Sequence, residues 1–423
     1  MGESDLGEFL DFVYQDFKYK LYVPGDKYAV ENLPLLVLLH GCNQNPDDFA
    51  AGTNMNALAE KEGFFVLYPD MNHPLNFADP AAFNAFGCWN WFLDKNQHRG
   101  EGHPKLINDM IQEVKREYRI DEQNVFAAGF SAGGSLACIL GVTYPEVFQG
   151  IAIYSGLAYG AANVSLLMDP TAEEARRRMA FGVPDPYQCA KEAFSEMGEN
   201  KRKMRVIVFH GAADPVVNPI NSEQVITQWA QTNYLVEGGT GHTDVTPVQV
   251  DSDHVNGKSF THSVYQDGSD EPILELWLID ELGHAWSGGC QAGSFTDPSG
   301  PNVTEIIWGF FHKQPQQREN EWMETREKEL FPAFVEESIQ SLEQTTTNPS
   351  EQLPVETIVH TQVNPPVQEP EEPATELPPI VTTSKTSTGK KSVGQDELPN
   401  KTPIRNFFKA ILAKFMKKKN SKR

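Results

Sequence analysis

One stretch decides the fold: Asn124-Val-Phe-Ala-Ala-Gly129-Phe-Ser131-Ala-Gly133-Gly-Ser-Leu-Ala-Cys-Ile-Leu140. Its first part is apolar, as a buried strand is, and its last part has the composition of a helix. Between them, the pattern Gly-x-Ser-x-Gly places Ser131 on a tight strand-to-helix turn, where glycines avoid steric clash. The stretch therefore predicts Ser131 as a nucleophile. The alternative is a small-residue turn that only lets the helix pack closely on the strand.

Outward from this stretch, short apolar runs alternate with helix-like patterns from residue 17 to about residue 313. Alternating strands and helices predict an α/β fold, with a mostly parallel central sheet and helices on both faces. Residues 157–203 interrupt the rhythm, either as a lid or pocket wall or as a plain loop excursion. The expected strands are Phe17–Val23, Leu35–Leu39, Phe64–Tyr68, Asn124–Phe130, Gly150–Tyr154, Arg205–Phe209 and Ile273–Ile279. The expected helices lie near Asn54–Glu62, Pro104–Tyr118, Gly133–Val142 and Asn221–Tyr234.

A nucleophilic serine needs an adjacent base and an acid that orients the base. In α/β-hydrolases these partners follow the serine along the chain in the order acid, then histidine. Asp214 comes after the apolar run Val206–Phe209 and a glycine turn, where a strand end presents a carboxylate. We therefore expect Asp214 to be the acid. The alternative is an Asx-turn residue before Pro215.

The base is expected after the last strand of the domain. His284 follows the apolar run that ends at Ile279 and lies in a glycine-flanked loop. We expect His284 to be the base, although a structural histidine that caps the loop is the alternative. His210 and His242 are its nearest rivals, the first at a strand end and the second in a Gly- and Thr-rich loop.

The tetrahedral intermediate of acyl transfer needs hydrogen-bond donors for its oxyanion. One expected donor is the backbone N–H of Ala132, directly after the nucleophile. The second is expected from the loop after the early strand, which reads His40-Gly41-Cys42. We expect the N–H of Cys42 to be this donor, with Asn43 as the alternative. The chemistry predicted in this way needs no metal or organic cofactor.

Composition limits the class of protein. The net charge is −23, from 35 Lys and Arg against 58 Asp and Glu, which excludes a general attraction to nucleic acid. The five cysteines form no Cys-x-x-Cys pair, so the sequence holds no zinc or redox motif of that type. We see neither a secretory signal nor an apolar run of about 18 residues. We therefore expect a cytoplasmic protein, or one at a granule or membrane surface, with an extracellular location as the alternative.

The sequence predicts four segments: a catalytic domain at 1–316, a charged helical segment at 317–343, a disordered Pro/Thr/Glu-rich linker at 344–403 and a basic amphipathic helix at 404–423. Segment 344–403 has too few apolar residues to offset its ordering entropy. The last segment is expected to anchor the chain at a polymer granule or an anionic membrane, or else to dock on its own body. Its apolar stripe is Ile404, Phe407, Phe408, Ile411, Leu412 and Phe415.

Several ordered motifs carry a resemblance to a known family. They are Leu-Leu-His-Gly-Cys-Asn-Gln at 38–44, Gly-Thr-Asn-Met-Asn-Ala-Leu-Ala at 52–59, Gly-Cys-Trp-Asn-Trp-Phe at 87–92, Ala-Gly-Phe-Ser-Ala-Gly-Gly at 128–134, Ser-Gly-Leu-Ala-Tyr-Gly-Ala-Ala at 155–162, Gly-His-Ala-Trp-Ser-Gly-Gly at 283–289 and Gly-Ser-Phe-Thr-Asp-Pro at 293–298. Over roughly residues 17–313 the chain resembles the esterase and polyhydroxybutyrate depolymerase family, the short-chain polyhydroxyalkanoate depolymerases of the α/β-hydrolase superfamily.

The resemblance implies hydrolysis of ester bonds in polyhydroxyalkanoate or short acyl esters, with Ser131, Asp214 and His284 as the triad. It supports Cys42 at the oxyanion hole and implies a disulfide between Cys42 and Cys88 in an oxidising compartment, and free thiols in a reducing one. Beside these motifs lie three tryptophans that are expected either to line an apolar acyl or polymer groove or to be simple core: Trp89, Trp91 and Trp286.

The chain departs from the family in its ends. Many members are secreted and carry a folded substrate-binding module, whereas here we expect a linker and one basic helix. Two other interpretations stay open. One is an esterase that acts on carbohydrate-linked acetyl or feruloyl esters with the same machinery. The other is a non-catalytic tethered scaffold or effector, which the three filled triad positions disfavour.

Overall fold

The computed structural model describes residues 7–25, 31–71, 87–163, 173–266 and 272–312. Strand β3 (Leu33–Leu39) is apolar on both faces, which explains why these residues form a sheet with helices on each side. Leu36 and Leu38 join one hydrophobic core, whereas Leu35 and its alternate neighbours join a second core on the opposite face. A strand of this kind is stable only where both faces of its sheet are covered.

The main sheet has ten strands in the order β1-β2-β4-β3-β5-β6-β7-β10-β9-β8. The centre, from β4 to β10, is parallel, whereas β1, β2, β8 and β9 pair antiparallel to their neighbours at the two ends. The strands are β1 (Glu8–Tyr14), β2 (Phe17–Val23), β3, β4 (Phe65–Pro69), β5 (Ile120–Phe130), β6 (Gly150–Tyr154), β7 (Arg205–Gly211), β8 (Gln249–Val255), β9 (Lys258–Gln266) and β10 (Pro272–Ile279). A small separate sheet pairs β11 (Trp286–Ser287) with β12 (Thr296–Asp297).

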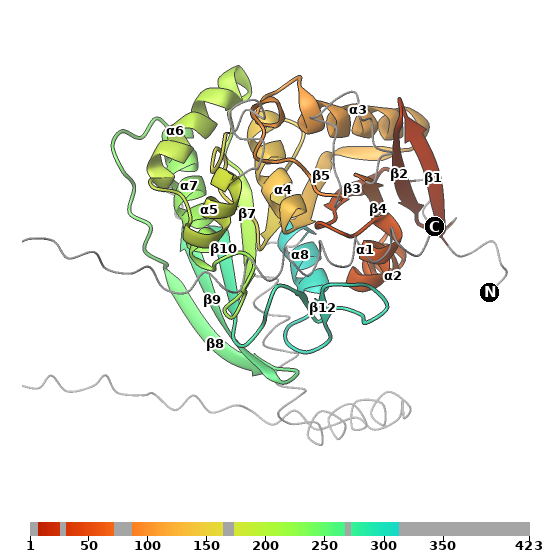
Figure 1. Cartoon of the computed structure of the whole chain (residues 1–423). Helices are drawn as coiled ribbons and strands as arrows, with labels where there is room; N and C mark the ends of the chain where they lie inside the picture. Colours follow the sequence, from red (N-terminus) through yellow and green to blue (C-terminus); the bar gives the residue numbers. More distant parts are fainter. Residues whose placement is uncertain (1–6, 26–30, 72–86, 164–172, 267–271, 313–423) are drawn as a thin grey trace, which may run out of the picture. The chain divides into compact units, whose positions relative to one another are not determined.

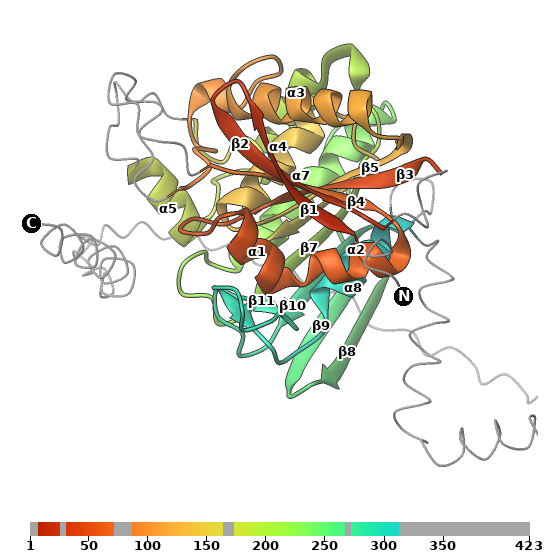
Figure 2. The same cartoon turned by 90° about the vertical axis from the view of Figure 1, so that its right-hand side faces the viewer.

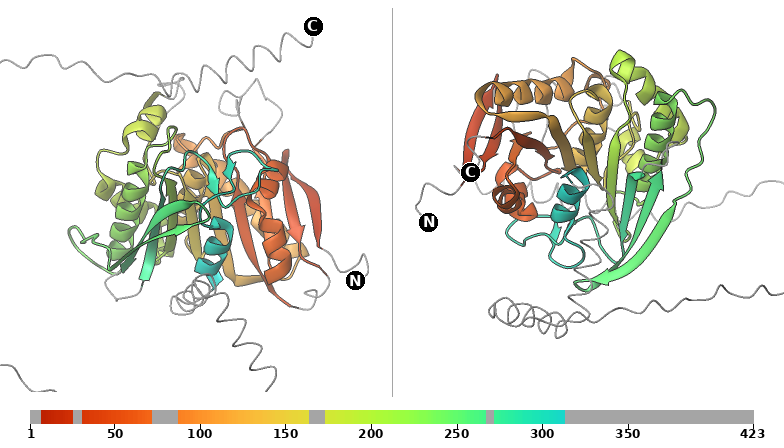
Figure 3. Two further views of the ribbon diagram at one scale, coloured as in Figure 1. Left: turned by 90° about the horizontal axis from the view of Figure 1, so that it is seen from below. Right: turned by 180° about the vertical axis from the view of Figure 1, so that it is seen from behind.

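Helices cover both faces of the sheet (Figures 1 and 2). One face carries α3 (Gly102–Glu117), α4 (Ala132–Thr143), α6 (Pro186–Met197) and α7 (Ile220–Val236), and α5 (Glu173–Phe181) contacts α7. The other face carries α1 (Pro46–Thr53), α2 (Met55–Glu62) and α8 (Val303–His312). Figure 3 shows the two helix layers from below and from behind, with the twisted sheet between them. The two short 3₁₀ helices are η4 (Asp94–Asn96) and η5 (Gly198–Asn200).

The strand register brings distant loops to one edge of the sheet. Leu39 of β3 pairs with Gly129 of β5, and Phe130 pairs with Tyr154 of β6. Farther along the sheet, Ile279 of β10 pairs with Gly211 of β7. The strands are parallel, so their carboxyl ends meet at this edge, which is where ligands bind in open α/β sheets.

All seven expected strands and all four expected helices are present, with ends that differ by a few residues. The structure adds the antiparallel strands β1, β8 and β9, the short strands β11 and β12, and the helices α1, α5, α6 and α8. Helix α1 is separate from α2 because Asn54 between them adopts a left-handed conformation, with φ of 56°. Residues 157–203, expected as a lid or loop excursion, contain α6, whose apolar side chains pack into the core between α4 and α7.

The chain divides into two units, Met1–Asn320 and Glu321–Arg423, and every described residue belongs to the first. The expected helical segment 317–343, linker 344–403 and amphipathic helix 404–423 therefore lie outside the described residues. Among the helices that the structure describes, none is long and apolar enough to cross a membrane.

Candidate active site

Ser131 lies on the turn between β5 and α4, in a conformation that few residues adopt. Its φ is 58° and its ψ is −117°, and its N–H donates to Tyr154 O at 2.8 Å. The turn is so tight that a Cβ on Gly129 would lie 2.2 Å from Gly133 O, and one on Gly133 would lie 2.1 Å from Leu39 O. Only glycine fits at these positions. Strain of this kind persists where the surrounding structure determines it, and here it places Ser131 at the carboxyl edge of the sheet.

The expected acid and base meet Ser131 although they lie far away in sequence. His284 Nε2 is 2.9 Å from Ser131 Oγ, and His284 Nδ1 is 2.6 Å from Asp214 Oδ2. Asp214 lies in the turn after β7, and His284 lies in the loop after β10. A carboxylate accepts only, so the proton on His284 belongs on Nδ1. This leaves Nε2 free to accept the proton of Ser131.

The carboxylate of Asp214 is buried and held by several donors. Its Oδ1 accepts the N–H groups of Val216 at 2.8 Å and Val217 at 3.0 Å. Burial alone would raise the pKa of this carboxyl, but the contacts with His210 and His284 outweigh burial and hold the pKa below its usual value of 3.8. Asp214 therefore stays charged at neutral pH and can orient the imidazole.

The two rival histidines have other surroundings. His210 is fully buried, with Nε2 2.9 Å from Val217 O and 3.4 Å from Asp214 Oδ2. Because both neighbours are oxygens, Nε2 carries the proton. His210 therefore stabilises the turn that contains Asp214. His242 stacks on Tyr187 of α6, with 4.0 Å between ring centroids.

The loop after β3 is held by contacts of His40, Gly41 and Cys42. Cys42 forms a disulfide with Cys88, as the resemblance implied. His40 is buried, its carbonyl accepts Trp89 Nε1–H at 3.0 Å, and its Nε2 accepts the N–H of Met71 at 3.2 Å. The Gly41 N–H donates to Gln44 Oε1 at 2.9 Å, so it is not available to a substrate. The N–H groups of Cys42 and Ala132 stay our candidates for the oxyanion donors.

The three tryptophans are buried, which favours the core over a substrate groove, the two alternatives that the sequence left open for them. Trp89 and Trp286 are each 1% exposed, and Trp91 is 6% exposed. The indole of Trp286 stacks on Tyr154 and donates to Thr304 Oγ1 at 3.0 Å. Large aromatic side chains with satisfied N–H groups pack the interior, and the sequence motifs around them did not separate this role from substrate contact.

Two phenylalanines that we did not predict lie beside His284, the expected base. The rings of Phe130 and Phe295 are centred 4.7 Å and 6.5 Å from the imidazole of His284. Phe295 has a φ of 55°, an unusual conformation for a bulky residue. Phe130 is part of the Gly-x-Ser-x-Gly pattern, so its place next to Ser131 could be predicted. Nothing in the sequence places Phe295 near His284.

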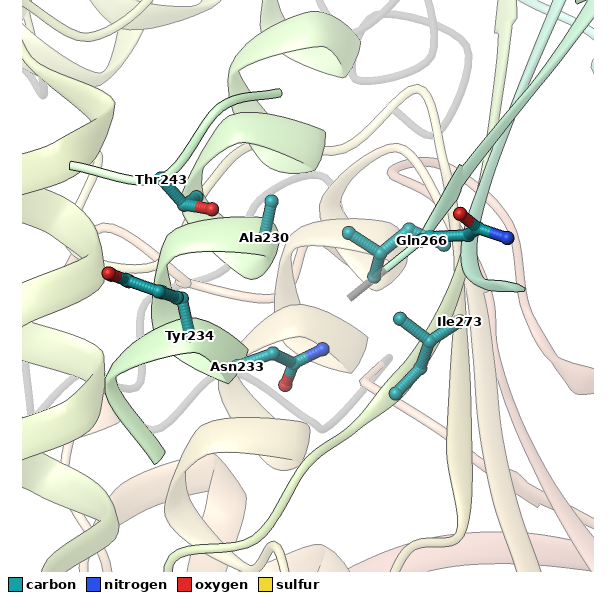
Figure 4. A pocket seen from close by; sticks show the side chains of 7 residues that line it. Ala230, Asn233, Tyr234, Thr243, Gln266 and Ile273 are labelled. Carbon is teal, nitrogen blue, oxygen red and sulfur yellow. The ribbon is translucent and has the colours of Figure 1, made fainter. Parts of the chain in front are cut away.

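The described residues also form a small pocket away from these side chains. It lies between α7 and the ends of β9 and β10 (Figure 4), and none of Ser131, Asp214 and His284 lines it. Within the described ranges, no group of three or more His, Cys, Asp or Glu side chains is arranged to hold a metal ion.

Comparison with known proteins identifies the family of this chain. The family described as "Esterase PHB depolymerase" matches residues 17–248, more than half of the 423 residues. The chain belongs to this family. The solved acetyl xylan esterase from Aspergillus awamori has the same fold, with a TM-score of 0.53 and 21% sequence identity over 66% of this chain and 94% of that one.

Curated relatives of this family member are ester hydrolases. Poly(3-hydroxyalkanoate) depolymerase C of Paucimonas lemoignei is 31% identical over 257 residues, which are 60% of this chain and 55% of the depolymerase. The chain thus spans about half the length of that relative. Feruloyl esterase B of Thermothelomyces thermophilus is 27% identical over 232 residues, 54% of this chain and 75% of the esterase.

Proposed function

We propose that this protein is a serine-dependent carboxylic ester hydrolase that works through an acyl-enzyme. The observation that carries the proposal is the continuous series from Ser131 Oγ to His284 Nε2 and from His284 Nδ1 to Asp214 Oδ2, at 2.9 and 2.6 Å. A nucleophile, a base and an orienting acid in this sequence of contacts are what acyl transfer from an ester requires.

The reaction proceeds in two steps. Ser131 Oγ attacks the ester carbonyl carbon as His284 Nε2 takes its proton, and the N–H groups of Cys42 and Ala132 donate to the oxyanion. The C–O bond of the ester breaks, and the leaving alkoxide receives the proton from His284. Water then attacks the acyl-enzyme, with its proton passing through the same nitrogen, and the carboxylic acid leaves. Asp214 stays ionised throughout and stabilises the imidazolium.

The substrate class that we favour is the ester bond of poly- or oligo(3-hydroxyalkanoates). This choice rests on the family and on the depolymerase relative, which is more similar to this chain than the feruloyl esterase is. The second candidate is a carbohydrate-linked feruloyl or acetyl ester, favoured by relatives named feruloyl esterase B and acetylxylan esterase A. Contact of 404–423 with a polymer granule or an anionic membrane stays part of the proposal.

The experiment that tests the proposal compares wild type with Ser131→Ala. The substrates are p-nitrophenyl acyl esters, an amorphous polyhydroxybutyrate suspension, methyl ferulate and acetylated xylan. We expect wild type to hydrolyse short acyl esters and to clear the polymer suspension, and the variant to do neither. Activity on the feruloyl or acetyl substrate without clearing of the polymer would select the second candidate. A variant as active as wild type would contradict the proposal.

A further inference from the structure

A buried glutamine connects two loops of the candidate site that are 250 residues apart in sequence. Gln44 is 2% exposed and lies between the end of β3 and the start of α1. Its Oε1 accepts the N–H of Gly41 at 2.9 Å, and its Nε2 donates to Ser294 O at 2.9 Å and to Asp48 Oδ2 at 3.1 Å. The amide orientation follows from these partners, since Oε1 faces a donor and Nε2 faces two acceptors.

Asp48 closes this network from the first turn of α1. Its Oδ1 accepts the N–H of Ser294 at 2.9 Å, and its Oδ2 accepts the Ser294 hydroxyl at 2.6 Å. Ser294 is thus held through its N–H, its hydroxyl and its carbonyl. The next residue is Phe295, with φ of 55° and its ring edge-on to the imidazole of His284. One end of the network is therefore the loop that carries Cys42, and the other end borders the catalytic base.

We propose that Gln44 is a positioning residue of the oxyanion hole. By accepting the Gly41 N–H, it turns that amide away from the substrate, which leaves the next amide, that of Cys42, to face the oxyanion. By donating to Ser294 O, it fixes this loop against the loop that bears Phe295. Preorganised donors act mainly on the transition state, so the effect of Gln44 falls on kcat and not on KM. The inference rests on the proposed ester hydrolysis.

The test compares Gln44→Met with the matched control Gln231→Met. Gln231 on α7 is also buried and also braces a loop, because its Oε1 accepts the Thr243 N–H at 2.8 Å and its Nε2 donates to Gly241 O at 2.9 Å. Gln231 has no contact with the triad. The control therefore measures the cost of losing a buried amide brace as such.

With p-nitrophenyl butyrate, we expect Gln44→Met to lower kcat about 10- to 100-fold and to change KM less than about 3-fold. This loss is smaller than the about 10²–10³-fold loss caused by deleting an oxyanion donor outright. The affinity for a trifluoromethyl ketone, whose adduct with Ser131 carries an oxyanion, should fall by the same factor as kcat/KM. Gln231→Met should lower thermal stability and leave kcat and the inhibitor affinity unchanged.

A second variant, Gln44→Glu, keeps an oxygen acceptor for Gly41 but places an oxygen against Asp48 Oδ2 and Ser294 O. We expect its kcat relative to wild type, measured at each pH, to recover as the pH falls and the introduced carboxyl regains a proton to donate. Equal kcat in Gln44→Met and wild type, a rise in KM alone, or a pH-independent ratio for Gln44→Glu would overturn the inference and leave the proposed function intact. A folded wild type without esterase activity would overturn both.

Discussion

Asp214 shows how hydrogen bonds and burial compete at a single carboxyl group. Burial raises the pKa of Asp214, whereas contacts with His210 and His284 lower it, with a net result below the usual 3.8. A pKa that is lower in the folded than in the unfolded chain means that the ionised carboxylate stabilises the fold at higher pH. This contribution is fully present above about pH 4 and is lost as the pH falls through the folded-state pKa.

We therefore predict a pH-dependent difference between wild type and Asp214→Asn. The difference in free energy of unfolding should change in favour of the variant as the pH falls below about pH 4, where the carboxyl of wild type gains a proton. Denaturant titrations between pH 3 and pH 7 measure it, and parallel curves throughout would contradict the assignment. Asp214→Asn should also lower kcat at pH 7 by about 10⁴-fold, since His284 loses its tautomer and orientation.

Gly133, two residues after Ser131, lies in close contact with the backbone at the end of β3. A Cβ there would lie 2.1 Å from Leu39 O and 2.7 Å from His40 O, and these are backbone atoms that cannot turn aside. We predict that Gly133→Ala lowers the free energy of unfolding by about 1–3 kcal/mol or more and displaces the loop that carries Cys42. Gly309→Ala is the control, because the structure has open space around Gly309 in α8. It should be neutral or stabilise by up to about 1 kcal/mol. Equal effects of the two substitutions, measured by urea denaturation, would contradict the steric account.

At the residue scale, the three candidate catalytic side chains were predictable because each follows a strand whose apolar pattern is clear. Parallel strands end at one edge, so residues after their carboxyl ends converge. The contact of Gln44 with Ser294 was not predictable, because it depends on how two long loops fold over that edge. The burial of Trp89 and Trp286 was not predictable either, since an indole suits a core and a groove equally well.

At the element scale, the disulfide between Cys42 and Cys88 links the loop after β3 to a segment 46 residues later. Closing a loop of this length raises the free energy of unfolding by about 2–4 kcal/mol, mostly because the disulfide restricts the unfolded chain. We predict that Cys88→Ser lowers the free energy of unfolding by this amount and lowers kcat, because the Cys42 amide loses a tether. The variant Cys138→Ser, at a buried free thiol, is the control for kcat. Activity unchanged by Cys88→Ser would show that the tether does not position the loop.

Most of the strands that we predicted are apolar on both faces, as β3, β6 and β7 are. Strands β1 and β8 lie at the sheet edges and are partly exposed, so their patterns are weaker. One local signal was present: Asn256-Gly257 joins β8 to β9 with φ of 48° and 81°, as a tight hairpin turn requires. Recognising it would have found both strands.

At the scale of the whole molecule, the candidate site lies within the unit Met1–Asn320. We predict that a chain ending at Asn320 has the same kcat/KM on a soluble ester as the full chain, and the same melting temperature. A large loss of either would show that residues 321–423 are needed for the fold or the site.

Deleting only 401–423 should shift the protein from the particulate to the soluble fraction, and an unchanged partition would contradict the predicted anchor.

The segments 344–403 and 404–423 stay predictions from composition and periodicity. The structure describes neither of them, so their roles depend on physical arguments about apolar content and charge. The central fold could be predicted in more detail than these segments, because strands of a buried parallel sheet are apolar on both faces.

The central claim, that Ser131 is the nucleophile of an ester hydrolase, is tested most directly by one measurement. Wild type and Ser131→Ala are compared for p-nitrophenyl butyrate hydrolysis and for covalent labelling by a fluorophosphonate, with circular dichroism to verify that both are folded. The account predicts hydrolysis and stoichiometric labelling of wild type, with a loss of about 10⁶-fold in kcat and no labelling in the variant. Labelling or hydrolysis by the folded variant at the wild-type level would contradict it.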